Sequence, residues 1–170
     1  MDSRLEFKLP PPFEEAVRSH ESAIMRFLLR MTANRDDALD LFQETWLRAY
    51  RAYPQLKSAD GMRPWLFRIA TNLCRNRARD NFRRSRAISR AMSDPTVTAA
   101  APGSHAHGIA DGVIHMRRLI AGLPDKQRLA LTMRKFGGLD YREIGAALEC
   151  SAASARANVC QALRRLRAAW

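Results

Sequence analysis

A stretch of small and turn-forming residues divides this chain of 170 residues into two parts. Residues 91–112 read AMSDPTVTAAAPGSHAHGIADG and contain few large apolar side chains, whereas leucine, phenylalanine and arginine recur at helical spacing on both sides. Such a composition is typical of a flexible linker. The sequence therefore predicts two small domains, residues 1–90 and 113–170, joined by a linker over residues 91–112.

Apolar residues recur at three- and four-residue steps in both parts, and no segment shows sustained alternation of β-branched residues. We therefore expect an all-α fold. In the first domain the spacing predicts helices over residues 16–31, 37–53 and 64–83. In the second domain it predicts helices over residues 111–121, 125–135, 141–148 and 152–170. A short turn followed by an arginine-rich last helix is the helix-turn-helix pattern.

Residues that end and begin helices support this organisation of the second domain. Asp140 with Glu143 three residues later forms a capping-box pattern, and Ser151 is a second N-cap before the last helix. Glu149 stands in the turn where many helix-turn-helix proteins have glycine. Because a left-handed conformation costs a non-glycine residue about 1 kcal/mol or more, we expect a locally adjusted turn at Glu149.

The charge of the chain indicates a polyanionic partner. Lysine and arginine number 29 against 17 acidic residues, which gives a net charge of +12, and only 4 of the basic residues are lysine. Arginine has a planar guanidinium that suits phosphates and base edges. Hydrophobic residues make up 46% of the chain, enough to bury a core. The expected partner is nucleic acid or an anionic membrane surface.

Several classes of protein are not expected. The N-terminal region has no apolar segment typical of a signal peptide, and no apolar run approaches the roughly 18 residues that span a bilayer. Cys74, Cys150 and Cys160 show no metal-binding spacing and indicate a reducing cytoplasm. His105 and His107 are weak evidence for a metal. Without a catalytic constellation, we expect no enzyme, no metal, no cofactor and no small-molecule substrate.

Two blocks of sequence resemble a known family. Residues 36–80, DDALDLFQETWLRAYRAYPQLKSADGMRPWLFRIATNLCRNRARD, resemble region 2 of bacterial sigma factors of the extracytoplasmic-function (ECF) group. Residues 123–167, LPDKQRLALTMRKFGGLDYREIGAALECSAASARANVCQALRRLR, resemble region 4 of the same factors. The resemblance covers about residues 14–167, with the linker unconstrained, and the two blocks in this order are strongly specific.

The resemblance implies an alternative sigma factor of the sigma-70 family that directs transcription initiation. Such a protein binds core RNA polymerase, recognises the −10 and −35 elements of promoter DNA and melts the promoter, while the polymerase performs the chemistry. An anti-sigma factor is expected to hold the free protein inactive by covering its polymerase-binding or DNA-binding surface. We expect a cytoplasmic protein without direct membrane insertion.

Carboxylates gather at the start of the second predicted helix, whose apolar positions begin at Leu39. Acidic residues at a helix N-terminus can simply interact with the helix dipole, for about 1 kcal/mol or less each. Here they continue into a mixed face, and DLFQETWL resembles the segment with which the family docks on the β′ coiled coil of the polymerase. Leu39 stands where an acidic residue is common. The implied polymerase-binding residues are Asp37, Asp40, Gln43, Glu44 and Leu47.

The third predicted helix is strongly basic, with 7 arginines between positions 75 and 90 against the single acid Asp80. A charge run of this kind can be only a solvated face. By the resemblance, Asn72 and the loop over residues 57–62 hold a base flipped out of the −10 element. Trp65 is expected in the core rather than as a stacking wedge. The candidate −10 residues are Lys57, Ser58, Asp60, Met62, Arg68, Asn72, Arg75 and Arg79.

The last predicted helix is the candidate for reading the −35 element in the major groove. Arg156 aligns with a basic residue that contacts bases and backbone in the family. The chain departs from its relatives at Ala157, Asn158 and Gln161, and asparagine and glutamine favour bidentate contacts to adenine. The candidate −35 residues are Ser154, Arg156, Ala157, Asn158, Gln161 and Arg164.

Two other classes of function stay open at this point. A stand-alone helix-turn-helix regulator that binds operators as a dimer would account for residues 113–170, but it would leave the acidic face unexplained. An enzyme acting on RNA would need catalytic residues for which the sequence offers no candidates.

Overall fold

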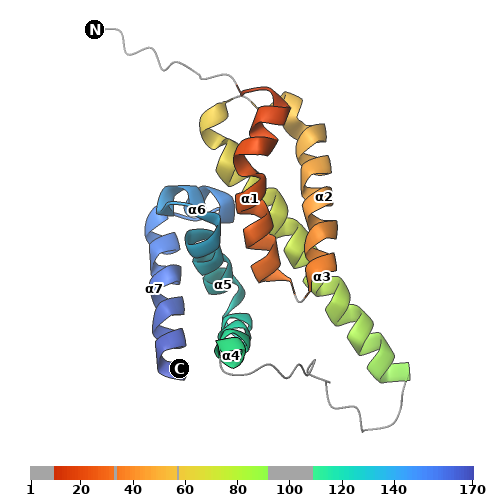
Figure 1. Ribbon diagram of the computed structural model, residues 1–170, viewed down its shortest axis with the longest axis vertical. Helices are drawn as coiled ribbons and strands as arrows, with labels where there is room; N and C mark the ends of the chain where they lie inside the picture. The colour runs from red at the N-terminus through yellow and green to blue at the C-terminus, as the bar shows by residue number, and fades with distance from the viewer. Residues whose placement is uncertain (1–9, 33, 57, 92–108) are drawn as a thin grey trace.

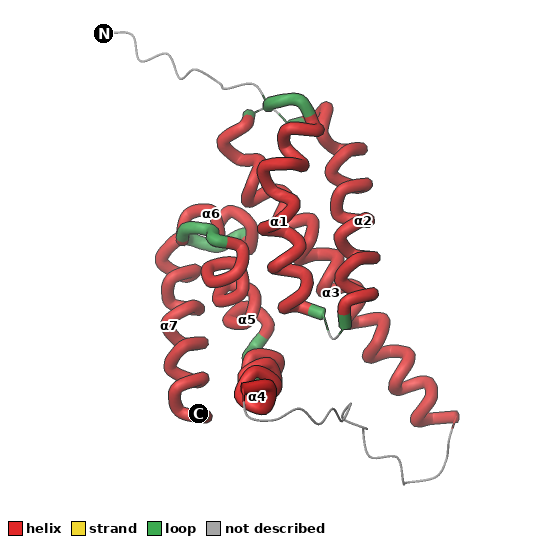
Figure 2. Tube along the Cα trace, in the orientation of Figure 1, coloured by secondary structure: helices red, strands yellow, loops and turns green. Residues whose placement is uncertain are grey.

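The computed structural model describes residues 10–32, 34–56, 58–91 and 109–170. Seven α-helices lie in this part of the chain: α1 (Phe13–Met31), α2 (Arg35–Ala52), α3 (Met62–Ala91), α4 (Ile109–Ala121), α5 (Asp125–Thr132), α6 (Tyr141–Leu148) and α7 (Ala152–Ala169). Every regular element of these residues is helical, which confirms the all-α fold class (Figure 2). The predicted linker falls largely outside the described residues; α4 begins at Ile109, earlier than predicted.

Helices α1, α2 and α3 form the first bundle, with short 3₁₀ turns over Tyr53–Gln55 and Ala59–Gly61 between α2 and α3 (Figure 1). Its core contains Phe27 and Phe67, whose rings meet edge to face with centroids 5.3 Å apart. Trp65 lies half-buried against this core, in agreement with its expected role. Helix α3 continues to Ala91, well beyond the predicted end at residue 83.

The buried face of α2 differs in part from the sequence prediction. Of the apolar positions expected in this helix, Ala49 is buried and Phe42 and Trp46 pack against the core, but Leu39 is exposed. Helix α2 also buries Ala38, Leu41 and Thr45. The small residues Ala38 and Ala49 allow α2 to approach its neighbours closely. Leu39 is therefore on the outer surface of the bundle, where it is available to a partner.

Helices α4 to α7 form the second unit. The five residues Met133–Gly137 (η3) extend α5 as one π-helical turn, and Gly138 ends it with a left-handed φ of 71°. The capping box between Asp140 and Glu143 is present, since each side chain accepts from the other residue's backbone N–H. Ser151 caps α7 by accepting from the N–H of Ser154. The predicted caps are thus confirmed.

The turn between α6 and α7 corrects one expectation. Glu149 itself takes the left-handed conformation, with φ 55° and ψ 48°, and its N–H donates to the carbonyl of Gly145. The turn therefore keeps its usual helix-turn-helix geometry and is not adjusted locally. A carbon at the Cβ position of Gly145 would lie 2.6 Å from the carbonyl oxygen of Cys150, so this close approach of α6 to the turn requires glycine.

The two units also pack against each other, with α1 and α3 against η3 and α6 (Figure 1). Gly137 lies directly against the Phe67 ring, and Arg63 donates to the Gly137 carbonyl at 2.7 Å. Arg26 donates to the carbonyl of Phe136 at 3.2 Å. This contact was not predicted, because the composition of residues 91–112 suggested two units held only by a tether.

Candidate DNA-binding and polymerase-binding surfaces

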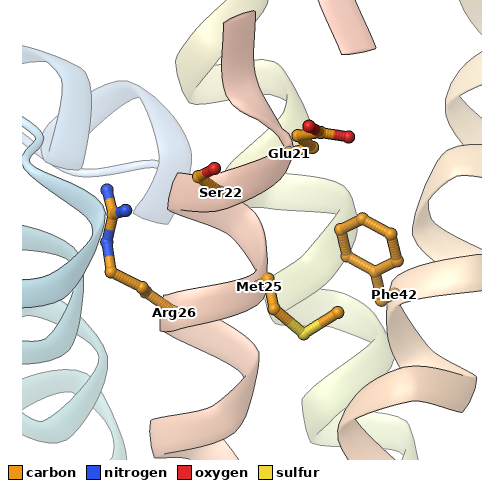
Figure 3. A pocket seen from close by; sticks show the side chains of 5 residues that line it. All are labelled: Glu21, Ser22, Met25, Arg26 and Phe42. Carbon is orange, nitrogen blue, oxygen red and sulfur yellow. The ribbon is translucent and has the colours of Figure 1, made fainter. Parts of the chain in front are cut away.

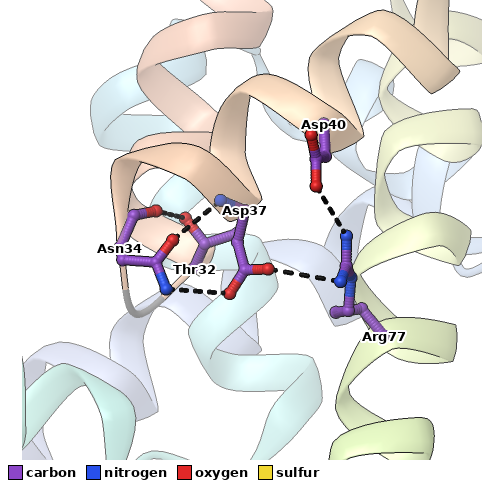
Figure 4. Close-up of polar contacts among 5 residues, drawn as sticks. All are labelled: Thr32, Asn34, Asp37, Asp40 and Arg77. Atoms are coloured by element: carbon purple, nitrogen blue, oxygen red, sulfur yellow. Dashed lines mark hydrogen bonds and ion pairs between the residues drawn. The ribbon is translucent and has the colours of Figure 1, made fainter.

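The acidic start of α2 has two parts with different surroundings (Figure 4). The Asn34 side chain accepts from the Asp37 N–H at 2.7 Å and donates to the Asp37 carboxylate at 3.1 Å. Arg77 of α3 reaches Asp37 at 3.3 Å and Asp40 at 3.4 Å. The Asp37 side chain is 24% exposed and that of Asp40 is 68% exposed. The Asp37 side chain is therefore held at the N-terminus of α2 by Asn34 and Arg77, whereas that of Asp40 is largely exposed to solvent.

The outer face of α2 continues beyond Asp40 with both polar and apolar side chains. Glu44 pairs with Arg48 of the same helix at 2.6 Å, and Gln43 is exposed. Leu47 and Tyr50 are among the exposed large hydrophobic residues, together with Leu39 nearer the start of the helix. Carboxylates interspersed with exposed apolar groups are suited to a protein partner more than to solvent alone. Tyr50 is not among the residues predicted from the sequence for this surface, and only its exposure adds it to them.

A shallow hollow lies between α1 and α2 (Figure 3). Met25 of α1 and Phe42 of α2 face each other across it, and Glu21 and Ser22 line its upper side. Arg26 points away from this pair, towards the C-terminal helices, where it donates to the Phe136 carbonyl. The hollow brings together no set of groups with an evident chemical role.

The predicted −10 residues fall into different environments. On α3, Asn72 and Arg79 are exposed, and neither side chain has a hydrogen bond or ion pair with the described part of the chain. Arg68 lies 3.6 Å from Glu149, and Arg75 lies 3.0 Å from Asp125. The surface of α3 thus contains the Asn72 amide, which has no side-chain partner in the described residues, beside three arginines, Arg68, Arg75 and Arg79.

The loop residues of the −10 set are less uniform. Met62, the first residue of α3, is only 2% exposed and lies in the core, where it cannot contact a base. Ser58 is half-buried and already has an interaction partner. Lys57 and the side chain of Asp60 lie outside the described residues.

None of the predicted −35 residues of α7 is buried, because the helix buries Ala155, Val159, Ala162 and Leu166 instead. Arg156, Ala157 and Arg164 are exposed. Asn158 donates to the Ser154 carbonyl at 3.0 Å, so one amide hydrogen is committed to its own helix. Gln161 accepts from Gln127 of α5 at 2.9 Å and is fixed against the rest of the unit. These bonds limit the contacts that Asn158 and Gln161 can offer to a base without rearranging.

The histidines do not form a cluster in the described residues, among which no group of three or more potential ligands lies close enough to hold a metal. His20 is half-buried near Arg63 and Glu143. Burial lowers the pKa of His20, Arg63 lowers it further, and Glu143 acts in the opposite direction. His105 and His107 lie outside the described residues.

The three cysteines differ in burial, and we therefore expect their thiols to differ in reactivity. Burial raises the pKa of the Cys74 thiol from 9.0 to about 12, while Cys160 is exposed. We expect a maleimide at pH 7 to modify Cys160 rapidly and Cys74 only slowly, as mass spectrometry of modified peptides would measure. Equal rates at the two residues in the folded chain would contradict the buried position of Cys74.

The same shift gives the direction of a pH effect. Because the folded-state pKa of Cys74 lies above the unfolded-state value, its contribution to stability is complete below about pH 9 and is lost as pH rises towards 12. The unfolding free energy of the protein should therefore fall between about pH 9 and pH 12, and it should fall less when Cys74 is replaced by alanine. Urea unfolding of the two proteins across this pH range measures the difference.

Both helical units match known families. Residues 16–84 match Sigma-70 region 2, and residues 115–166 match Sigma-70, region 4. The RNA polymerase sigma-H factor of Pseudomonas aeruginosa is 27% identical over 164 residues, which cover 88% of this chain and 81% of that protein. The ECF RNA polymerase sigma factor SigE of Mycolicibacterium smegmatis is 31% identical over 166 residues, covering 92% of this chain and 61% of that protein.

A solved structure shares the fold. The sigma factor RpoE from Bartonella quintana, in its complex with the anti-sigma factor NepR, superimposes with a TM-score of 0.67 at 20% identity. The match covers 92% of this chain and 95% of that one. No helix in the described part of the chain has the length and apolar character to cross a membrane. On the two regional matches and these relatives, the chain belongs to the sigma-70 family, in its extracytoplasmic-function group.

Proposed function

We propose that this protein is an alternative sigma factor that directs core RNA polymerase to promoters with −10 and −35 elements and opens them. One observation supports this most directly, namely the segregation of charge over the fold. Asp40 and Glu44 lie on the outer face of α2, whereas arginines line α3 and the outward face of α7. A protein that binds both DNA and a second protein needs such separated surfaces.

The proposed division of labour follows the two units. Residues 1–90 would bind the β′ coiled coil through Asp37, Asp40, Gln43, Glu44 and Leu47, and would bind the −10 element through α3. Residues 113–170 would bind the −35 element through α7, with residues 91–112 as the connection. Joining two weakly binding units on one chain raises the effective concentration of the second once the first is bound.

On α3, the proposed −10 contacts are Asn72 for a flipped base and Arg68, Arg75 and Arg79 for phosphates. On α7, Ser154 and Arg156 lie in the first turns, where a recognition helix reaches base edges, and Arg164 lies further along, where phosphates are met. The buried position of Met62 argues against a base contact there in the free chain.

The protein would perform no chemical step itself, and the polymerase would make the RNA. The proposal includes action in the cytoplasm, where the polymerase is, and control by an anti-sigma factor that covers the α2 or DNA-binding surfaces. The Bartonella quintana relative supports this form of control, because its structure is that of a complex with an anti-sigma factor.

Run-off transcription with core polymerase tests the proposed function. The purified chain, core polymerase and genomic fragments should give discrete transcripts that core polymerase alone does not make. If the chain binds duplex DNA but neither co-purifies with core polymerase nor starts transcripts, it is a stand-alone helix-turn-helix regulator.

Replacing Arg156 by alanine should weaken binding to the −35 element by about 1–3 kcal/mol and relax the preference at one base pair. Arg156 is exposed on the outward face of α7 and has no ion pair in the described residues, so its loss should not disturb the fold. Binding to a panel of single-base variants measures the effect. An equal loss on all sequences would identify a phosphate contact. Arg165→Ala, which removes another exposed arginine of α7 outside the predicted set, serves as the control.

A further inference from the structure

The exposed Gln161 of α7 is held by a buried side chain of a neighbouring helix. Gln127, in the first turn of α5, is only 7% exposed, and its Nε2 donates to Oε1 of Gln161 at 2.9 Å. Helix α5 packs directly against α7, so the Gln127 side chain is enclosed by the core between them. The carboxamide of Gln161 is therefore fixed through its oxygen, although the residue itself lies on the surface.

This bond decides which end of Gln161 is available to DNA. A glutamine side chain has a carbonyl oxygen that accepts and an NH2 group that donates. When glutamine reads adenine it uses both ends at once, because the oxygen accepts from N6 and the nitrogen donates to N7. Here the oxygen already accepts from Gln127, whereas Nε2 of Gln161 makes no hydrogen bond within the described residues. The free end of Gln161 is thus the donor.

Gln127 has no other polar role in the described part of the chain. Its Oε1 is buried there without a hydrogen-bond partner, and the bond to Gln161 is the one hydrogen bond that its side chain makes. A buried acceptor without a partner costs free energy, so an apolar side chain of similar shape would suit this place better for stability alone. Fixing Gln161 is the role that the surroundings of Gln127 offer it.

Asn158, three residues before Gln161 on α7, keeps the group that Gln161 has lost. Its Nδ2 donates to the Ser154 carbonyl at 3.0 Å, and its Oδ1 accepts no hydrogen bond within the described residues. Residues three apart lie on the same side of a helix. The two neighbouring amides therefore offer different groups, an acceptor at Asn158 and a donor at Gln161.

We propose that Gln127 is a positioning residue that makes Gln161 a hydrogen-bond donor to the −35 element, where it selects guanine and not adenine. In the major groove guanine presents two acceptors, N7 and O6, whereas adenine presents N7 beside the N6 donor. The inference rests on the proposed function, because it requires α7 to lie in the major groove. It replaces the expectation, drawn from residue type alone, that Gln161 favours adenine.

Hydrogen exchange of the side-chain amides tests the geometry without DNA. In full-length chains labelled with ¹⁵N, the NH2 group of Gln127 should exchange about tenfold or more slowly than that of Gln161, since only the former is buried and donates within the fold. Gln127→Met and Gln161→Leu assign the two NMR signals. Exchange at Gln127 that is as fast as at Gln161, or faster, would overturn the arrangement.

Gln127→Met tests the effect on base preference. Methionine is unbranched like glutamine, has no donor and removes the unpaired oxygen, so the fold should be kept. The full-length chain with core polymerase is bound to promoters that carry every base pair in turn at each −35 position. Gln161→Leu should remove the preference at one position, which identifies the base pair that Gln161 faces. There, Gln127→Met should lower the preference for guanine over adenine about tenfold, because the freed oxygen can accept from N6.

Thr132→Val is the matched control for Gln127→Met. The Thr132 hydroxyl, also on α5, is likewise buried without a hydrogen-bond partner in the described residues, but it holds no side chain of α7. This variant should leave every base preference unchanged. In Gln127→Met itself, the preferences at the other −35 positions should also stay as they are, including any that Asn158 confers. Circular dichroism verifies that each variant is folded.

Three results separate this inference from the proposed function. An unchanged ratio of guanine to adenine in a folded Gln127→Met chain would overturn the inference. An equal loss of affinity on all sequences in Gln161→Leu would make Gln161 a phosphate contact and would also overturn it. If the parent with core polymerase shows no base preference at any −35 position, the proposed function itself is wrong, whereas amide exchange still measures the bond between Gln127 and Gln161 because that assay contains no polymerase or DNA.

Discussion

The double substitution Asp40→Arg with Glu44→Arg should abolish binding to core RNA polymerase. Both carboxylates lie on the outer face of α2, and Asp40 is largely exposed, so each reversal places a positive charge where a basic partner would dock. Each surface ion pair that the change removes, with Arg77 and Arg48, contributes only about 0–1 kcal/mol to the fold. We therefore expect a folded protein that has lost its partner.

Co-purification or fluorescence anisotropy with core polymerase measures this effect, and an affinity loss of about 100-fold or more is expected, equivalent to about 2.8 kcal/mol. The matched control is Glu15→Arg with Glu21→Arg, which makes the same charge change at exposed positions of α1. Equal loss in both double variants would mean that overall charge, rather than the α2 surface, governs binding. Retention of full affinity in Asp40→Arg/Glu44→Arg would favour the stand-alone regulator.

Replacing Asn72 by alanine should impair promoter opening and spare polymerase binding. The Asn72 amide is exposed on α3 and uncommitted, so its removal should leave the fold intact. If the amide pairs with a flipped base, its loss leaves that base unsatisfied and costs about 1–3 kcal/mol, a reduction of about 5- to 150-fold in open complexes.

Permanganate reactivity of unpaired thymines measures opening, and affinity for core polymerase is measured in parallel. Asn76→Ala, one turn further along α3 and also exposed, is the control. If the Asn72→Ala variant opens promoters normally, the Asn72 amide does not hold a flipped base. If Asn76→Ala reduces promoter opening by the same amount, the effect is a general one on α3.

The pattern of large apolar residues predicted most of the helices, because burial of a helical stripe depends mainly on local sequence. The caps at Asp140 and Ser151 were likewise predictable, since an N-cap forms between residues three apart in the chain. The full buried face of α2 was not, because Ala38 and Thr45 are small or polar residues that are buried by the packing of α1 and α3 against α2. This placed Leu39 on the surface, against the expectation from its hydrophobicity.

The sequence alone thus determined the helical class, the helix-turn-helix and the distribution of acidic and basic residues, all of which depend on residues near one another in the chain. Only the tertiary structure decided which of those charges are available. Arg68 and Arg75 meet Glu149 and Asp125, which are distant in the sequence, and Asp37 is held by Arg77. Such pairings depend on how the helices and the two units dock, and the close contact between Gly137 and Phe67, which lie far apart in the chain, has no local signature in the sequence.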